Sequence, residues 1–274
     1  MLVLKQLFQF YVNASIHVAL AVVALYLVNV ESLNILNNND LMGFLFFETI
    51  VCYNFVKYGV EAEKYVIVSK PSHRPIQVFS FLAFGACLYF FFRLPMQLWF
   101  VIALLTVVSA LYAIPFLPSS RNLRSLGGLK IFLVGAVWVG FTVVLPAVEH
   151  QLGFSKQLLL LSLQIFVLVI VLILPFEIRD LKYDKLALKT LPQRWGISRT
   201  KQFGYALAFI FLLLGIFMAD GQLNRISFYC LTTLLLILML LRTKKIQSRY
   251  YASFWVEGIP IICVLSIKLM DMVF

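Results

Sequence analysis

Long apolar runs recur along the whole chain and are separated by short polar segments. Nine such runs are evident, at about residues 7–28, 41–57, 77–92, 96–114, 130–148, 157–176, 203–219, 226–241 and 252–272. About 20 apolar residues cross a bilayer, and a backbone in lipid must pair its polar groups internally, so each run predicts a membrane-spanning helix. The alternating segments of an outer-membrane barrel are absent from the sequence. The pattern predicts an all-α polytopic membrane protein, a single domain of nine transmembrane helices over residues 1–274.

Composition supports the membrane prediction. Of 274 residues, 62% are hydrophobic, 26 are Phe and only 13% are charged. The first run, from Phe8 to Val30, is too long for the apolar part of a signal peptide, so we expect an uncleaved first span. The four cysteines lie singly inside predicted spans without any C-x-x-C pair. They therefore predict small packing residues rather than a disulfide framework or a zinc site.

The positive charge is distributed unevenly between the predicted loops. When the loops are numbered from an inside N-terminus, all but four of the 23 Lys and Arg residues fall on the inside. The four exceptions are Arg93, Lys156, Arg225 and Lys268. This bias predicts an inside N-terminus and an outside C-terminus. Membrane lipids then account for the net charge of +11, and no nucleic-acid partner is expected.

Most of the candidate chemistry lies in the inside loop that begins at Glu177. Asp180 and Asp184 are four residues apart, so a helix continuing from the sixth span puts both carboxylates on one face. Two such carboxylates can share a Mg²⁺ ion with ligand phosphate oxygens. The surrounding cations, which include Arg179, suit an anion with several oxygens, and an adjoining apolar cavity would suit a lipid diphosphate. The alternative is a solvated, salt-bridged loop that simply obeys the positive-inside rule.

Several short motifs resemble those of the UbiA-type intramembrane prenyltransferases. Asp180-x-x-x-Asp184 followed by Lys185, by Lys189-Thr190-Leu191-Pro192 and by Gly196 resembles the second aspartate-rich motif of that family. Three weaker matches are Asn54, which stands where the first motif opens, Arg74-Pro75, and Leu111-Tyr112-x-x-Pro115. Together these matches extend over essentially the whole chain.

The resemblance implies a nine-helix fold with its polar site on the cytoplasmic side, in the inner membrane of a prokaryote. It implies two Mg²⁺ ions that bridge an isoprenyl diphosphate, and transfer of the prenyl group to a membrane-soluble acceptor, usually an aromatic ring. Residue by residue, Asp180 and Asp184 are the expected metal ligands, and together with Asn54 the expected catalytic residues. The expected substrate-binding residues are Lys57, Glu61, Arg74, Arg179, Lys185, Lys189 and Tyr112.

The first aspartate-rich motif departs from the family pattern Asn-Asp-x-x-Asp-x-x-x-Asp. Phe55, Tyr58 and Ala62 occupy its three aspartate positions. On a helix, Glu61 returns to within about 20° of the direction of Asn54, and Lys57 lies about 60° away on the same side. Lys57 could therefore supply a fixed positive charge in place of a metal ion. We expect one Mg²⁺ site at Asp180 and Asp184, and the substitutions put the second site in doubt.

Two acidic residues, Glu48 and Glu257, lie inside predicted spans, where ionisable groups are costly and often functional. Glu48 could accept a proton or anchor the acceptor, or it could be a protonated carboxyl bonded to a neighbouring helix. Glu257, at the start of the ninth span, could instead extend to the surface.

Three functions fit the sequence. The first is a divergent prenyltransferase, the second a non-catalytic relative that binds or moves a polyprenyl lipid, and the third an unrelated small-solute transporter. The third predicts functional sensitivity at Glu48 or Glu257 rather than at the aspartate pair.

Overall fold

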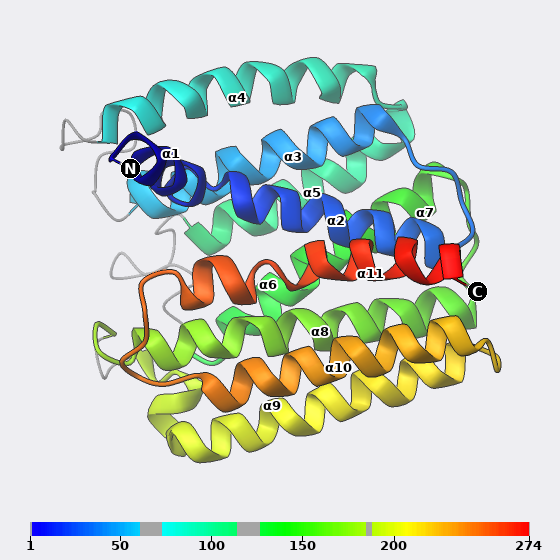
Figure 1. The fold of residues 1–274 in the computed structure, drawn as a ribbon. Coiled ribbons are helices and arrows are strands. Elements are labelled where there is room, and N and C mark those ends of the chain that lie inside the picture. The colour runs from blue at the N-terminus through cyan, green and yellow to red at the C-terminus, as the bar shows by residue number, and fades with distance from the viewer. Residues whose placement is uncertain (1, 61–72, 114–126, 185–187, 274) are drawn as a thin grey trace.

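The fold was analysed in a computed structural model, which describes residues 2–60, 73–113, 127–184 and 188–273. Helices run side by side along one common direction in a bundle, with α1 beginning at one end and α11 ending at the other (Figure 1). The α-helices are α1 (Leu2–Asn13), α2 (Ile16–Ser32), α3 (Asn39–Asn54), α4 (Arg74–Arg93), α5 (Met96–Ala113), α6 (Leu129–Val139), α7 (Leu145–Glu149), α8 (Lys156–Asp180), α9 (Leu191–Met218), α10 (Leu223–Arg242) and α11 (Ile259–Val273). The π-helices are η1 (Phe55–Val60), η4 (Gly140–Val144) and η6 (Tyr251–Val256).

The nine predicted membrane spans all fall on these helices. In the described residues, seven helices are long and apolar enough to cross a membrane. They are α4, α5, the continuous α6–η4–α7 segment, α8, α9, α10, and η6 with α11. An eighth arises if α1 and α2, which meet at 55°, count as one broken span. Nine spans are therefore not confirmed: the predicted second span falls on α3, which has 16 residues, and on η1, which follows it directly.

Side-chain caps fix where several helices begin. The Asn38 side chain accepts hydrogen bonds from the backbone of Asp40 and Leu41, and Ser155 does the same for Leu158. At the start of α9, Thr190 and Gln193 form a capping box, and Pro192 occupies the first turn. These residues satisfy amide groups that a helix start leaves unpaired.

Irregular backbone interrupts the bundle near the end that carries the predicted motifs. Ser15 adopts a left-handed conformation with φ 62° and separates α1 from α2. Gly196 has φ 75° at a kink in α9, a conformation that favours glycine over other residues. Two of the three π-helices, η1 and η6, also lie at this end, and π-helical turns often occur at functional sites.

Three hydrophobic clusters hold the described part of the bundle together, two of them large and the third a small one of Ala19, Ile50 and Ala83. The largest one surrounds α8, whose buried side chains pack against α6, α9, α10 and η6. The second one joins α2, α3, α5 and η4, with Tyr26, Leu41 and Leu98 among its fully buried members. A cavity opens beside the largest cluster, whose residues Ile131, Val169 and Leu172 form part of its wall.

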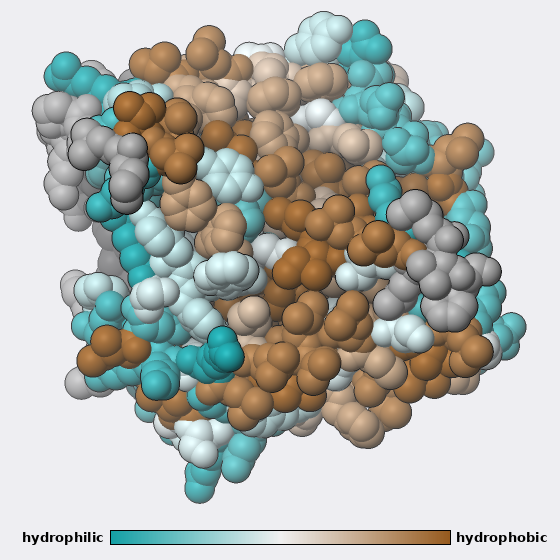
Figure 2. Space-filling view, in the orientation of Figure 1, coloured by the Kyte–Doolittle hydropathy of each residue, from teal (hydrophilic) through white to brown (hydrophobic). Residues whose placement is uncertain are grey.

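The outer surface is apolar in the middle of the bundle. Figure 2 shows hydrophobic side chains across the centre and hydrophilic side chains gathered towards the two ends. Large side chains such as Phe81 and Phe100 are 61% and 77% exposed on helices α4 and α5. Such extensive apolar exposure is stable only against lipid, so the protein is an integral membrane protein.

The four cysteines are all free. Cys87 and Cys263 are buried among apolar side chains. Cys52 is half-buried and Cys230 is exposed, so two of the four cysteines lie in the packed interior.

Candidate active site

A cavity of about 640 Å³ opens at one end of the bundle, between α8, α6, η1 and η6. Its polar lining consists of Lys57, Lys130, Arg179, Glu177, Asp180, Asp184, Glu257, Tyr53, Tyr112, Tyr183 and Ser253. Its apolar lining consists of Val56, Ile131, Val134, Trp138, Val169, Leu172, Ile173 and Phe176. One cavity therefore combines a dense group of charges with a hydrophobic wall.

The end of α8 supplies most of the acidic groups. Asp184 continues the helical turn, because its amide donates to the carbonyl of Asp180 over 2.8 Å. Both aspartates line the cavity, as predicted from their spacing. Glu177, one turn before Asp180, lines it as well and is only 4% exposed. The acidic face is therefore Glu177-x-x-Asp180-x-x-x-Asp184, one carboxylate longer than the predicted pair.

Lys130, at the start of α6, is the cation at the centre of this acidic face. Its Nζ lies 2.7 Å from Glu177 Oε1 and 3.8 Å from Asp184 Oδ2. The two side chains of the closer pair are 12% and 5% exposed, so this ion pair is largely withdrawn from water. A buried pair of this kind is strongly destabilised when one partner is removed.

The position of Lys130 depends on a close backbone contact. Gly127 has φ 64°, and a β-carbon there would lie 2.2 Å from the carbonyl oxygen of Leu188. Only glycine fits, and the contact joins the start of α6 to the segment that leads into α9. Lys130 and Glu177 were both missed as site residues in the sequence analysis. The i, i+3, i+7 spacing of Glu177 was the available signal, whereas nothing in the sequence indicated Lys130.

Asp180 is neutralised by its own neighbour. Arg179 Nε and Nη2 donate to the two carboxylate oxygens of Asp180 over 2.7 and 3.2 Å. Such a two-point contact is among the stronger hydrogen-bonded pairs in proteins. Both side chains line the cavity, so Arg179 lies at the predicted site, with its cation shared with Asp180.

Lys57 is the charged residue that the segment of the first predicted motif contributes to the cavity. It lies in η1, lines the cavity, and donates a 3.0 Å hydrogen bond to Ser15 Oγ. Glu257, at the end of η6, also lines the cavity, together with Lys57 and Arg179. Glu257 therefore faces the site instead of only extending to the surface.

Asn54 does not line the cavity; its side chain is 3% exposed and faces α1, α2 and α4. Its Oδ1 accepts from Ser15 Oγ over 2.8 Å, and its Nδ2 donates to Ala14 O and Ser80 Oγ. These bonds satisfy the amide and tie α3 to the break between α1 and α2. Asn54 therefore stabilises the packing of α3 against α1, α2 and α4, and it contacts Ser15, to which Lys57 is hydrogen-bonded.

The remaining predicted substrate-binding residues are only partly brought together. Tyr112 lines the cavity. Arg74 and Lys189 are exposed and do not line it. Glu61 and Lys185 lie outside the described residues, so their predictions stand as made.

Two further apolar cavities continue the main one into the bundle. The first, of about 150 Å³, shares Tyr53, Val56, Tyr112, Val134 and Trp138 with the main cavity. The second, of about 520 Å³, lies between α3, α4 and α5. Val56 lines all three cavities, so they lie next to one another between the charged end and the apolar interior.

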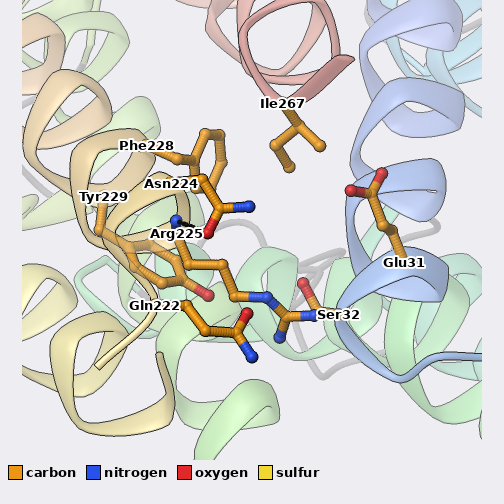
Figure 3. Close-up of a pocket in the computed structure, with 8 residues that line it drawn as sticks. All are labelled: Glu31, Ser32, Gln222, Asn224, Arg225, Phe228, Tyr229 and Ile267. Atoms are coloured by element: carbon orange, nitrogen blue, oxygen red, sulfur yellow. Dashed lines mark hydrogen bonds between the residues drawn. The ribbon is translucent and has the colours of Figure 1, made fainter. Parts of the chain in front are cut away.

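A smaller pocket lies at the opposite end of the bundle (Figure 3). Its space is about 110 Å³, and the Arg225 side chain extends across it towards Ser32 and Glu31. Because it is small and contains one Arg beside one acidic residue, it offers far less room and cationic charge than the main cavity.

The charged end of the main cavity fits one divalent cation better than two. Among the described residues, no three or more His, Cys, Asp or Glu side chains are grouped to hold a metal ion. However, Glu177 Oε2 and Asp184 Oδ2 are buried and have no hydrogen-bond partner in that part of the chain. Mg²⁺ is commonly held by one or two carboxylates together with phosphate oxygens and water, so these two oxygens fit one ion.

Comparisons by sequence and by structure give different results. No known family's sequence profile matches the chain, and no curated protein matches it in sequence. The fold, in contrast, is similar to a solved UbiA homolog from Archaeoglobus fulgidus, with a TM-score of 0.62 and 12% identity over 96% of this chain and 99% of that one. The structure of a UbiA homolog from the same organism bound to Cd²⁺ matches with a TM-score of 0.62 and 10% identity, over 95% and 99%. This protein therefore has the fold of the UbiA-type membrane proteins.

Proposed function

We propose that this protein binds an isoprenyl diphosphate inside the membrane and transfers its prenyl group to a membrane-soluble aromatic acceptor. The observation that carries the proposal is the main cavity itself, which places three cations and four acidic groups beside an apolar wall. A ligand that satisfies both parts has a multiply charged head and a hydrocarbon chain.

The three cations of the cavity would bind the diphosphate head of the ligand. Lys57 approaches from η1, Lys130 from α6 and Arg179 from α8, so a diphosphate between them meets positive charge from three elements. Arg179 presents a planar fork of donors, whereas the two lysines act as compact charges. Lys57 thus supplies positive charge on the side where the first aspartate-rich motif has lost its acids.

Glu177 and Asp184 are the residues that would hold a Mg²⁺ ion, since each has a buried carboxylate oxygen that accepts no hydrogen bond. Lys130, 3.8 Å from Asp184 Oδ2, would lie beside that ion. When bound, Mg²⁺ would neutralise charge on the diphosphate leaving group. The UbiA homolog solved with Cd²⁺ supports a metal site in this fold. Asp180 in this arrangement holds Arg179 in place beside the head group.

The hydrocarbon chain of the ligand fits the apolar wall formed by α6 and α8, with Val169, Leu172 and Ile173 along α8. In the reaction, the allylic carbon–oxygen bond breaks and its electron pair leaves with the diphosphate. An aromatic carbon of the acceptor then bonds to the allylic cation, and the ring loses a proton. The apolar wall keeps water away from the cation, which water would otherwise trap.

The second candidate is a non-catalytic protein that binds or moves a polyprenyl lipid. It is favoured by the loss of the first motif and by the pairing of Asp180 with Arg179, which removes one acidic group from metal binding. The likeness to UbiA homologues favours both of these functions over an unrelated solute transporter.

We place the charged cavity on the cytoplasmic side of a prokaryotic inner membrane. All but four of the 23 Lys and Arg residues fall in loops predicted to lie on this side of the membrane. Positive residues near span ends favour the cytoplasmic face.

The decisive experiment measures binding of farnesyl diphosphate to the purified full chain in lipid nanodiscs, with and without Mg²⁺. We expect Mg²⁺-dependent binding that weakens about tenfold or more in Asp184→Asn, with Asp220→Asn at the other end of the bundle as the matched control. Absence of farnesyl diphosphate binding would overturn the proposal.

A transfer assay separates the two candidates. Prenylation of an aromatic acceptor by the purified protein, lost in Asp184→Asn, supports the transferase. Binding of farnesyl diphosphate without product formation across a panel of phenolic acceptors would favour the non-catalytic carrier.

A further inference from the structure

The apolar cavity between α3, α4 and α5 is open towards the lipid. Three residues on its lining, Phe84 and Leu88 of α4 and Val107 of α5, are 47%, 39% and 54% exposed. They belong to the apolar outer surface of the bundle, so the cavity communicates sideways with the hydrocarbon part of the bilayer. With about 520 Å³ it is large enough for a small organic molecule.

The walls of this cavity are rich in aromatic rings. Phe44 and Phe55 come from α3 and η1, Phe84 and Phe91 from α4, and Trp99 from α5. Phe91 and Trp99 stack on each other with their ring centroids 5.1 Å apart. Aromatic walls favour a ligand with its own ring, because ring pairs gain energy beyond the burial of area.

One carboxyl group lies in this apolar lining, that of Glu48 on α3. Its side chain is partly exposed to the cavity, and no hydrogen bond or ion pair joins it to any other residue in the described ranges. An unpaired carboxyl in hydrocarbon is costly, and intramembrane acids usually face a partner or a functional cavity. The cavity thus presents one strong hydrogen-bonding group without a protein partner.

The same cavity lies next to the charged site, separated from it by the small intermediate cavity. The small intermediate cavity shares Cys52, Val56 and Ser109 with it, and shares Tyr53 and Tyr112 with the main cavity. Glu48 and Lys57 are nine residues apart along α3 and η1, which corresponds to about 13 Å of helix. A molecule of modest length can therefore contact Glu48 at one end and approach the main cavity with the other.

We propose that Glu48 anchors the hydroxyl group of a lipid-soluble phenol or hydroquinone that enters from the bilayer between α4 and α5. This inference rests on the proposed function, and it names the acceptor class and the route by which the acceptor arrives. A hydroxyl fits a carboxyl because each can donate to and accept from the other when the carboxyl is protonated. The main cavity remains free for the diphosphate and its chain.

A cationic ligand fits this cavity less well. Glu48 is the only Asp or Glu among the residues that line it, and the other walls are almost entirely apolar. A lipid ammonium would have to lose its hydration for one carboxylate, which rarely repays the cost of burial. A plain hydrocarbon chain, in turn, would leave the carboxyl without a partner.

The test uses Trp99 as a reporter within the cavity. The full chain in phosphatidylcholine nanodiscs is titrated with 4-(8-bromooctyl)phenol, and bromine quenching is taken as the difference between wild type and Trp99→Phe. The matched probe is the methyl ether of the same molecule, which keeps the shape and removes the hydroxyl donor. We expect the phenol to reach half-saturation at roughly fivefold lower concentration than the ether, the size of one net hydrogen bond.

Two variants locate the preference for the phenol. It should disappear in Glu48→Leu and persist in Thr49→Val, which alters the same helix at a buried site that does not line the cavity. If Glu48→Leu does not fold, infrared difference spectra of wild type and Glu48→Gln identify the Glu48 carbonyl band. That band should shift with the phenol and not with the ether.

Equal affinity for phenol and ether in the wild type would overturn the inference. Tighter, Glu48-dependent binding of 8-bromooctylammonium than of the phenol would overturn it as well. The assay contains no diphosphate, so its failure is separate from that of the proposed function. If the protein prefers the phenol but does not bind farnesyl diphosphate, the proposed transferase function is wrong and the Glu48 site stands. If it binds farnesyl diphosphate but shows no preference for the phenol, the Glu48 site is wrong and the proposed function stands.

Discussion

The ends of α8 and α3 face the same cavity with opposite chemistry. The α8 end presents Glu177, Asp180 and Asp184, and the α3 end presents Lys57 at η1. The α8 acids are balanced by Lys130 and Arg179 within the site, whereas Asn54 at the α3 end is bonded away from the cavity. The acidic side has thus kept groups that hold cations, and the other side has become cationic itself.

This difference suggests how the proposed site, in which one of the two acidic motifs is missing, would bind a diphosphate. A metal ion and a lysine both place positive charge beside phosphate oxygens, but a lysine carries its charge permanently and needs no acidic ligands. Losing three aspartate positions and presenting Lys57 changes the local charge in the direction that an anionic head requires. The proposed site is therefore asymmetric, with one ion on the α8 side and a fixed charge on the α3 side.

The largest expected effect is at Lys130, which balances the α8 side. Lys130→Met leaves Glu177 and Asp184 buried without their cation, so we expect a loss of about 3–5 kcal/mol in the free energy of unfolding. Unfolding in denaturant, followed by circular dichroism in mild detergent, measures this loss. Lys182→Met, an exposed lysine near the same end, is the control. Equal stability of the two variants would show that the pair does not hold the site together.

A substitution at Asn54 tests whether this residue only stabilises the packing of α3 or also takes part in ligand binding. Asn54→Ala removes the partners of Ser15 Oγ and the Ala14 carbonyl, so we expect about 1–3 kcal/mol of lost stability. Because the side chain does not line the cavity, farnesyl diphosphate affinity should change less than twofold in protein that remains folded. A large loss of farnesyl diphosphate affinity at unchanged stability would instead show that Asn54 takes part in binding.

Lys57 tests the fixed charge directly. Lys57→Met should weaken farnesyl diphosphate binding about tenfold, since one charge-assisted contact to phosphate is removed. Lys57→Arg, which keeps the charge, should recover most of the affinity. Raising the Mg²⁺ concentration should not compensate for Lys57→Met if the lysine occupies the side without acidic ligands. Full compensation by Mg²⁺ would indicate that a second ion binds there after all.

The smallest effects are expected at Arg74 and Lys189, which are exposed and do not line the cavity. Arg74→Gln and Lys189→Gln should each change farnesyl diphosphate affinity less than threefold, because exposed charges act weakly across water and salt. An effect as large as that of Lys57→Met would mean that these cations approach the ligand when it is bound.

The sequence predicted the class of the fold and half of the site. Apolar runs of span length required helices in lipid, and the helices of the structure fall on all nine runs. The count of nine spans stays a prediction, because the break at Ser15 and the change from α3 to the π-helix η1 depend on local backbone geometry. The spacing of Asp180 and Asp184 was enough to place both carboxylates on one face, since that geometry belongs to a single helical turn.

What the sequence by itself determined was therefore local: helices of membrane length, the acidic face at the end of α8, and the missing aspartates after α3. Only the tertiary structure decided which side chains meet across helices. It brought Lys130 to Glu177 across 47 positions, turned Asn54 towards Ser15 instead of the cavity, and left Glu48 facing an apolar space. Periodicity fixes the direction of a side chain relative to its own helix, whereas its partners depend on how the helices pack.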